Sequence, residues 1–305
     1  MEKMKNIFLT GITGFIGGTI AVKLKERNYN VVGLARKEED VKAIQQLGFE
    51  CVKGSLQDIS VLKNAIEKCD AVIHTADSDN MYIADNFIDI LKHSGKTFIY
   101  TSGSNIIANW DNPATAEFVY TEDFPIETTS PNGHRVAINN KILRAAIQNI
   151  RAIVIVPSMV YGDGLLLKKE SAQLPLLIKT AKSKKAGVYT GNKEHGWSNI
   201  HVEDLAELYI SALEKAKSGS YFFAENGFST FYTLAKTIHH SLGYLGEPIS
   251  LNTIEAIGIW GKMMATVALG SDCRMNSDKA RTMLHWKPTH PYITAYIKTT
   301  LHHEI

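Results

Sequence analysis

Little in this sequence points to a charged partner or to a membrane. The chain of 305 residues has 33 Lys and Arg against 31 Asp and Glu, spread along its length. It therefore has no strong field to attract nucleic acid or an anionic surface. The apolar run at residues 6–10 is far shorter than the ~20 residues that cross a bilayer, and no small-residue cleavage site follows it. We expect neither a nucleic-acid nor a membrane partner.

Cysteine is scarce, and its positions exclude two further classes of protein. Cys51, Cys69 and Cys273 are odd in number, lie far apart and form no Cys-x2-Cys pair. This pattern argues against a disulfide framework and against a thiolate metal site, and it favours a reducing, cytoplasmic location. The histidine pair at 239–240 has no third ligand at a recognisable spacing, so we expect no metal site.

The sequence does contain a regular alternation of two kinds of segment. Over the first 157 residues, short apolar runs alternate with segments long enough for a helix. Several of these runs are continuously apolar, as in strands that are covered on both faces. The pattern predicts an α/β fold, a Rossmann-type doubly wound parallel sheet. The strand-like runs are residues 6–10, 30–36, 49–55, 70–76, 97–103 and 151–157.

Beyond residue 160 the rhythm changes to that of helices, with one short apolar run at 220–225. We expect a domain at 1–157 that contains the parallel sheet and a smaller, mainly helical lobe at 158–305, interleaved with the first. The cleft between them is the expected site for a small-molecule substrate. The predicted helices are 171–184, 203–216, 230–242 and 254–268.

The glycine-rich segment "GITGFIGG" follows the first strand and opens the first helix. Its Gly-x2-Gly-x2-Gly spacing lets a pyrophosphate approach main-chain N–H groups at the positive end of a helix dipole. A tight turn with close helix packing is the plainer alternative, but the place of the motif in an alternating fold favours a dinucleotide. The expected cofactor residues here are Gly11, Thr13, Gly14, Phe15, Ile16 and Gly17.

The end of the second strand carries cations. Arg36 and Lys37 stand where an acidic residue would accept hydrogen bonds from the adenosine ribose hydroxyls. Cations at this point suit a 2′-phosphate, so we expect NADP rather than NAD. The alternative is a solvated basic pair that is neutralised by the acidic run at 38–40.

Seven segments together resemble the short-chain dehydrogenase/reductase superfamily, in its extended form that includes nucleotide-sugar epimerases and dehydratases. The resemblance covers nearly the whole chain. The segments are "TGITGFIGG" (10–18), "GSLQD" (54–58), "VIHTA" (72–76), "FIYTSGS" (98–104), "VPSMVYGDG" (156–164), "WSNIHVEDLAELY" (197–209) and "LHWKPTHP" (284–291).

The resemblance implies further cofactor contacts and a possible homodimer through helices of the fourth and sixth sheet units. It places Ser55 and Leu56 near adenine, although Ser55 stands where an acidic residue is usual. It has His74, Thr75 and Ala76 line the phosphates and ribose. It sets four residues against the nicotinamide: Pro157, Ser158, Met159 and Val160.

The catalytic Tyr-x3-Lys pair of the superfamily is missing from its expected place, residues 125–145, which contain no tyrosine. In that pair the lysine lowers the pKa of the tyrosine, which exchanges a proton with the substrate oxygen. The Tyr-x3-Lys matches at 189–193 and 232–236 lie in the second lobe, and such matches are expected by chance.

His134 and Arg135 occupy the expected place, at the start of a predicted amphipathic helix. They resemble an atypical subgroup in which His-x3-Arg replaces Tyr-x3-Lys, but Ile138 stands four residues after His134. Adjacent residues diverge by roughly 100° around a helix. His134 can act as an acid or a base near neutral pH. Alternatively it is an exposed residue at a helix start, where the dipole disfavours added positive charge.

The oxygen-positioning serine of the superfamily is also displaced. Gly103 stands where the hydroxyl is usual, with Ser102 and Ser104 as flanking substitutes. We expect an NADP-dependent oxidoreductase in which Ser102 or Ser104 holds a carbonyl oxygen, while His134, aided by Arg135, handles the proton. Two alternatives stay open: an epimerase or dehydratase that uses the nicotinamide transiently, and a non-catalytic NADP-binding sensor.

Overall fold

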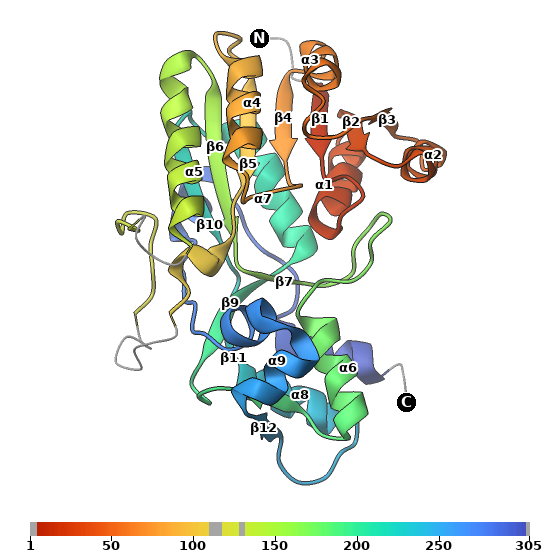
Figure 1. The fold of residues 1–305 in the computed structure, drawn as a ribbon, viewed down its shortest axis with the longest axis vertical. Coiled ribbons are helices and arrows are strands. Elements are labelled where there is room, and N and C mark those ends of the chain that lie inside the picture. Colours follow the sequence, from red (N-terminus) through yellow and green to blue (C-terminus); the bar gives the residue numbers. More distant parts are fainter. Residues whose placement is uncertain (1–4, 110–117, 128–131, 303–305) are drawn as a thin grey trace.

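The structure is a computed structural model that describes residues 5–109, 118–127 and 132–302. Its centre is a seven-stranded parallel sheet in the order β10-β6-β5-β4-β1-β2-β3 (Figure 1). This confirms the predicted doubly wound α/β fold. The strands are β1 (Asn6–Thr10), β2 (Asn30–Ala35), β3 (Glu50–Lys53), β4 (Ala71–His74), β5 (Thr97–Thr101), β6 (Arg151–Pro157) and β10 (Ser220–Ala224).

Helices cover both faces of this sheet because neighbouring strand residues point to opposite sides. In β1, Ile7 and Leu9 belong to one buried cluster while Phe8 belongs to the other. The first cluster lies under α1 (Phe15–Glu26), α2 (Glu38–Gln46) and α7 (Val202–Lys215). The second lies under α3 (Ile59–Glu67), α4 (Met81–Leu91) and α5 (Gly133–Arg144).

The strand order reverses between β1 and β4. From β1 the chain proceeds outward to β2 and β3, then returns to β4 on the other side of β1 and proceeds to β5 and β6. In open α/β sheets, ligands bind at such a switch point, outside the carboxyl ends of the strands. The fold therefore places the glycine turn after β1 beside the loop that follows β4.

Much of the chain beyond β6 forms a smaller body below the sheet (Figure 1). Helices lie at all four predicted places, although the one at 203–216 is α7, which packs on the main sheet. The predicted helix 254–268 is interrupted at Gly261, whose φ of +79° ends it. Besides α7, the helices beyond β6 are α6 (Leu174–Lys184), α8 (Phe231–Ser241), α9 (Thr253–Trp260), the π-turn η4 (Met264–Ala268), α10 (Asp278–Leu284) and α11 (Ile293–His302).

This smaller body also contains two small sheets that the sequence pattern does not predict, since four of their five strands have only three residues, too few to show a period. One has the order β11-β9-β7 and the other pairs β12 with β8. The strands are β7 (Met159–Tyr161), β8 (Val188–Thr190), β9 (Gly196–His201), β11 (Phe228–Thr230) and β12 (Ile249–Leu251).

The later part of the chain returns to the main sheet. β10 pairs with β6 and extends the sheet, and α7 packs against α1. A short 3-10 helix, η1 (Ser104–Ile107), follows β5, and another, η3 (Ala145–Gln148), follows α5. The domain boundary at 157/158 stays a prediction. Within the described residues, no helix is both long and apolar enough to cross a membrane, and all three cysteines are free thiols.

Candidate functional site

The turn between β1 and α1 presents an uncapped helix N-terminus. Gly14 is the N-cap residue, no side chain caps the first amides, and no acidic residue lies in the first turn of α1. Because the first N–H groups of a helix lack partners within it and carry partial positive charge, this end suits an anion. The turn therefore fits a dinucleotide pyrophosphate.

The three glycines of the turn serve different purposes. A Cβ on Gly17 would lie within 3.0 Å of the Gly11 carbonyl oxygen, and one on Gly11 within 3.0 Å of Thr75 Oγ1. These two glycines are required for close packing of the turn against α1 and the loop after β4. A Cβ on Gly14 would have more room, since it would lie 3.1 Å from the Gly11 carbonyl oxygen. Gly14 also lies on the wall of both adjacent cavities. Gly14 therefore leaves more room for a ligand to approach the backbone than Gly11 or Gly17 does.

The first of these cavities has a volume of about 390 Å³ and lies beyond the carboxyl ends of β1, β2, β3 and β4. It collects residues that are far apart in sequence, as the switch point requires. The sequence-predicted cofactor residues on its wall are Gly11, Thr13, Gly14, Arg36, Lys37, Ser55, Leu56, Thr75 and Ala76.

The cations at the end of β2 differ in their surroundings. Lys37 Nζ lies 3.2 Å from Glu39 Oε1, so its charge is partly neutralised. Arg36 is exposed on the wall of the cavity, and within the described residues no carboxylate pairs with its guanidinium. Asp40 also lies on this wall. The cavity wall therefore carries the Arg36 guanidinium together with the carboxylates of Asp40 and Asp77.

The second cavity, of about 290 Å³, shares Gly11, Gly14 and Thr75 with the first. Its wall includes the predicted residues Phe15, Ile16, Gly17, Ser158 and Val160. It adds Lys168, Glu170 and Gln173 from the loop before α6, which the sequence analysis missed. Because they share Gly11, Gly14 and Thr75, the two cavities adjoin along the glycine turn, and we refer to them together as the cleft.

Ser158 carries a buried hydroxyl in this second cavity, and in the described part of the chain that hydroxyl has no hydrogen-bond partner. A buried polar group without a partner is rare and favours a ligand contact. Pro157 and Met159, predicted beside it, are buried and do not lie on either wall, since alternate strand residues point to opposite faces.

His74 was expected to line the cofactor, but its side chain is fully buried beneath the loop and lies on neither wall. Its Nε2 donates to the Asp77 carbonyl oxygen at 2.7 Å, so Nδ1 accepts from Thr10 Oγ1, also at 2.7 Å. Burial lowers the pKa of His74 to about 4, so the ring is neutral. It fixes the loop after β4 from below.

At the end of β5 a cluster of charged side chains meets on Asp79, and we call Asp79, Asn105, His134 and Arg135 the Asp79 clamp. Arg135 Nη2 donates to Asp79 Oδ2 at 2.6 Å, and its Nε donates to Oδ1. His134 Nε2 lies 2.8 Å from the same Oδ1, and Arg135 Nη1 donates to Asn105 Oδ1 at 2.8 Å. The Arg135 hydrogen bonds hold the pKa of Asp79 at about 2.

The expectation that His134 and Arg135 diverge is wrong. Adjacent residues do leave a helix roughly 100° apart, but the long arginine side chain reaches the same carboxylate oxygen that His134 contacts. Asp79 lies in the loop after β4, and its backbone N–H donates to Asp77 Oδ1 at 2.9 Å. Because Asp77 lies on the first cavity wall, the clamp adjoins the cofactor cleft.

The two predicted serines lie beside the clamp. Ser102 is 5% exposed, and its hydroxyl has no partner within the described residues. Ser104 is buried in η1, where its backbone carbonyl accepts a weak hydrogen bond from Cys273 Sγ. Between them, a Cβ on Gly103 would lie within 3.0 Å of Arg135 Nη1. The guanidinium thus occupies the space in which a side chain at 103 would stand.

Asp79 and Asn105 are functional candidates that sequence reasoning missed. Both lie in connecting segments, Asp79 after β4 and Asn105 in η1, where polar residues are ordinary. The only available signal was a basic pair at the start of α5 with no acidic neighbour nearby in sequence. Such a pair requires a carboxylate from elsewhere, but the sequence does not say which one.

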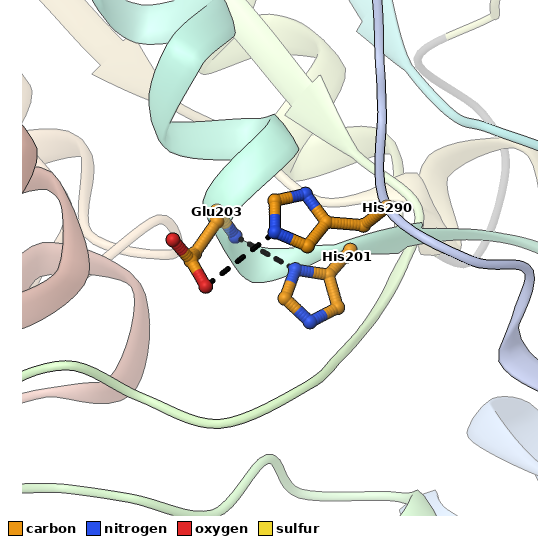
Figure 2. A group of neighbouring side chains, drawn as sticks. All are labelled: His201, Glu203 and His290. Atoms are coloured by element: carbon orange, nitrogen blue, oxygen red, sulfur yellow. Dashed lines mark hydrogen bonds and ion pairs between the residues drawn. The ribbon is translucent and has the colours of Figure 1, made fainter. Parts of the chain in front are cut away.

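A second cluster, of His201, Glu203 and His290, lies where α7 begins (Figure 2). Their ligand-type atoms all lie within 4.8 Å of one another. However, the two imidazole rings are stacked, with centroids 4.0 Å apart and planes 3° from parallel. A ligand nitrogen binds a metal in the plane of its ring, so two stacked rings do not converge on one ion as they stand.

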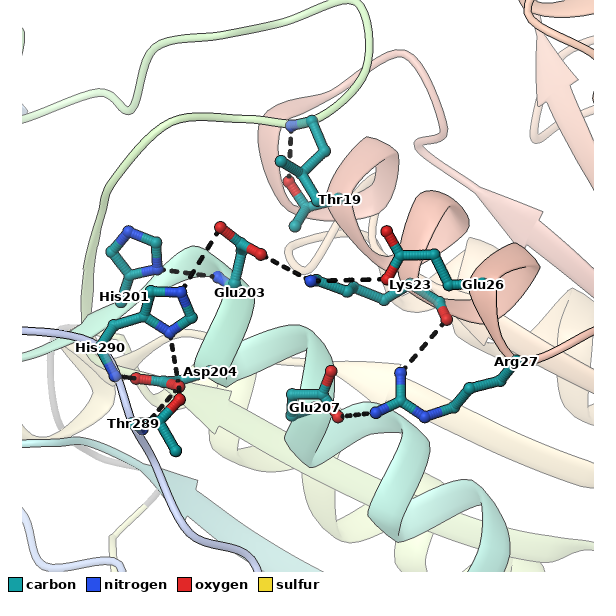
Figure 3. Close-up of polar contacts among 11 residues, drawn as sticks. Thr19, Lys23, Glu26, Arg27, His201, Glu203, Asp204, Glu207, Thr289 and His290 are labelled. Atoms are coloured by element: carbon teal, nitrogen blue, oxygen red, sulfur yellow. Dashed lines mark hydrogen bonds and ion pairs between the residues drawn. The ribbon is translucent and has the colours of Figure 1, made fainter.

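The ion pairs around this cluster join distant segments (Figure 3). Asp204, 1% exposed, accepts from the backbone N–H groups of Thr289 and His290 at 2.9 and 3.0 Å. Glu203 pairs with Lys23 of α1 at 2.6 Å. The conspicuous sequence segments 197–209 and 284–291 therefore meet here, and they hold α1, α7 and the C-terminal region together.

The fold and the cleft define a dinucleotide-binding α/β protein with a charged cluster beside the cofactor end. The chain belongs to the NAD dependent epimerase/dehydratase family, whose model matches residues 7–222. It is an NAD(P)-dependent enzyme of the oxidoreductase and epimerase type, and relatives of this chain include dehydrogenases and reductases.

Two relatives and one solved structure illustrate the similarity. An uncharacterized protein of Schizosaccharomyces pombe is 29% identical, with 93% of this chain and 95% of that protein covered. A decarboxylating sterol-4-alpha-carboxylate 3-dehydrogenase of Dictyostelium discoideum is 28% identical, with 75% and 74% covered. A dTDP-glucose 4,6-dehydratase of Bacillus anthracis in complex with NAD shares the fold, with a TM-score of 0.76, 19% identity, and 97% and 95% covered.

Proposed function

We propose that this chain is an NADP-dependent oxidoreductase that transfers a hydride between the nicotinamide and the carbonyl or alcohol carbon of a small molecule. The observation that carries the proposal is the adjacency of two features. A cleft along the glycine turn has in its first cavity Arg36, which pairs with no carboxylate of the described residues, and the Asp79 clamp adjoins the loop that lines this cavity. The sterol dehydrogenase among the relatives has an activity of this class.

The cofactor preference rests on Arg36. A free guanidinium on the wall beyond β2 gives a 2′-phosphate a bidentate partner, whereas a ribose diol gains more from a carboxylate. Asp40, four residues after Arg36 in the sequence, lies on the same wall. The Gly14 turn and the Ser158 hydroxyl would hold the phosphates and the nicotinamide end respectively.

We assign to His134 the transfer of a proton to the substrate oxygen. Its ring is about half exposed, and Nε2 is engaged with Asp79, so Nδ1 is the nitrogen left for a substrate. When bound, NADPH supplies the hydride with its electron pair to the carbonyl carbon. His134 then delivers a proton to the oxygen. Ser102 and Ser104 flank the point where that oxygen would lie, and Arg135 stands between them.

A titration followed by a turnover assay tests this function. The dissociation constants of NADPH and NADH are measured first, and a panel of carbonyl compounds is then added while the reduced-nicotinamide absorbance is followed. Tighter binding of NADPH and loss of absorbance with at least one carbonyl support the proposal. Tight binding with no turnover favours a sensor or an enzyme that recycles its nicotinamide internally, and binding of neither cofactor contradicts the proposal.

A further inference from the structure

Gly103 and Arg135 share one small space at the carboxyl end of β5. A Cβ on Gly103 would lie within 3.0 Å of Arg135 Nη1, closer than real Cβ contacts come. The backbone of Gly103 is extended, with φ −154° and ψ 143°, a conformation that any residue can adopt. Glycine is therefore needed at 103 for the guanidinium, and not for the backbone.

The Arg135 guanidinium is held in place, but not all of its N–H groups have an acceptor among the described residues. Of the five N–H groups of an arginine, Nε and one N–H of Nη2 donate to Asp79, and one N–H of Nη1 donates to Asn105. Within the described residues, one N–H on each terminal nitrogen is left without an acceptor. The side chain is 18% exposed, so these two donors are partly desolvated and still accessible.

These features describe a binding position for an oxygen atom. Two donors on a planar, permanently charged group match a carbonyl oxygen, and donors that are already oriented cost no reorganisation when charge develops. Asp79 and Asn105 come from the loop after β4 and from η1, so the guanidinium is held from two separate segments. By contrast, Ser102 is only 5% exposed and has one hydroxyl to offer.

We propose that the Arg135 guanidinium, seated in the space that Gly103 leaves for it, binds the carbonyl oxygen of the substrate through the N–H groups that Asp79 and Asn105 leave free. As the carbonyl carbon gains a hydride and its electron pair, the π electrons of the C=O bond move to oxygen, and the guanidinium stabilises that negative charge until a proton arrives from His134. Asp79 and Asn105 are positioning residues for Arg135. This inference rests on the proposed reductase function.

Single substitutions on both sides of the shared space test the proposal with a carbonyl compound that the wild-type protein reduces. Arg135→Ala removes the donors, and Gly103→Ala displaces them. Each should lower kcat/KM by about 100-fold or more, the usual effect of losing an oxyanion donor. The dissociation constant of NADPH should stay within about twofold. Arg144→Ala removes an exposed arginine from the same helix and should leave both quantities unchanged.

Two rescues separate binding of the oxygen from a merely structural role. Added guanidinium ion should restore turnover to Arg135→Ala but not to Gly103→Ala, where the space is filled. The double variant Arg135→Ala with Gly103→Ser places a hydroxyl in the vacated space, and it should exceed Arg135→Ala by about fivefold or more in kcat.

The proposal is overturned if Arg135→Ala keeps kcat/KM within threefold of wild type. It is also overturned if a folded Arg135→Ala loses NADPH affinity and turnover together, or if neither rescue occurs while Ser102→Ala alone abolishes turnover. Failure of the wild-type protein to oxidise NADPH with any carbonyl would instead reject the proposed function.

Discussion

At the glycine turn after β1 the groups offered to a ligand belong to the backbone, whereas at the end of β5 they belong to side chains from three separate segments. The turn needs only residues that are close in sequence, because β1 leads directly into α1. The Asp79 clamp needs the loop after β4, η1 and the start of α5 to meet. The comparison teaches that the phosphate-binding turn is formed locally, whereas the rest of the cleft and the proposed chemistry depend on tertiary structure.

The same contrast appears in two histidines. His74 is fully buried, and both its ring nitrogens are occupied by the protein, so it supports the loop and cannot reach a ligand. His134 is half exposed, with one nitrogen engaged by Asp79. A motif that includes a histidine therefore predicts its position well and its role poorly, since the role depends on which neighbours surround the ring.

The largest effect should come from Gly17→Ala, which changes the glycine turn, the first of the two regions compared. A Cβ there meets the Gly11 carbonyl oxygen, so the turn must shift, at a cost of about 1–3 kcal/mol of folding free energy. NADPH binding should become unmeasurable in a calorimetric titration. Gly258→Ala is the matched control, since it lies in a helix with open space around it and should be neutral or slightly stabilising.

In the Asp79 clamp, Asp79→Asn should lower kcat by about 10- to 100-fold, because Arg135 and His134 would no longer be held in the orientation that the reaction needs. The NADPH dissociation constant should be unchanged, in contrast to Gly17→Ala. Steady-state kinetics at saturating NADPH measure this. Asp89→Asn serves as control, since it breaks an exposed ion pair with Lys92 and should change neither quantity. A parallel loss of cofactor affinity would remove the distinction between the two regions.

Arg36→Ala should weaken NADPH binding by about tenfold, the value of one hydrogen-bonded charge pair. NADH affinity should stay the same, since that cofactor has no 2′-phosphate, and the ratio of the two dissociation constants is the measured quantity. An equal loss for both cofactors would mean that Arg36 contacts a shared part of the molecule. The cofactor preference would then have another source.

The smallest effects concern pH and stability. His74 has a folded pKa of about 4, below its usual 6.5, so the unfolded chain binds its proton first. Its contribution to stability is complete above pH 6.5 and is lost as pH falls toward about 4. Asp79, with a folded pKa of about 2 against 3.8, contributes fully above that value, and its contribution is lost between about pH 4 and 2.

Melting temperatures measured across pH separate these two contributions. His74→Gln should flatten the decline between pH 6.5 and 4, although His201, whose pKa burial also lowers to about 4, keeps part of it. Asp79→Asn should flatten only the decline below pH 4. A variant of His74 with an unchanged profile would show that its burial does not govern protonation.

Much of the fold could be predicted from the sequence because it depends on local patterns. Apolar runs predict the strands through β6, and the spacing of glycines predicts the turn. The residues after β1 to β4 lie on one cavity wall, because parallel strands end at one edge. Asp79 and Asn105 could not be found, since a single polar residue in a loop carries no sign of its distant partner. The packing of Gly103 against Arg135 could not be predicted from the sequence either.

The most direct test of the account compares His134→Gln with wild type, measuring NADPH affinity and the single-turnover rate of NADPH oxidation on the same sample. If binding belongs to the cleft and chemistry belongs to the clamp, the dissociation constant should stay within about twofold while the rate falls by about 100-fold or more, as expected for loss of a general acid. An unchanged rate, or a rate and an affinity that fall together in a folded variant, would contradict the account.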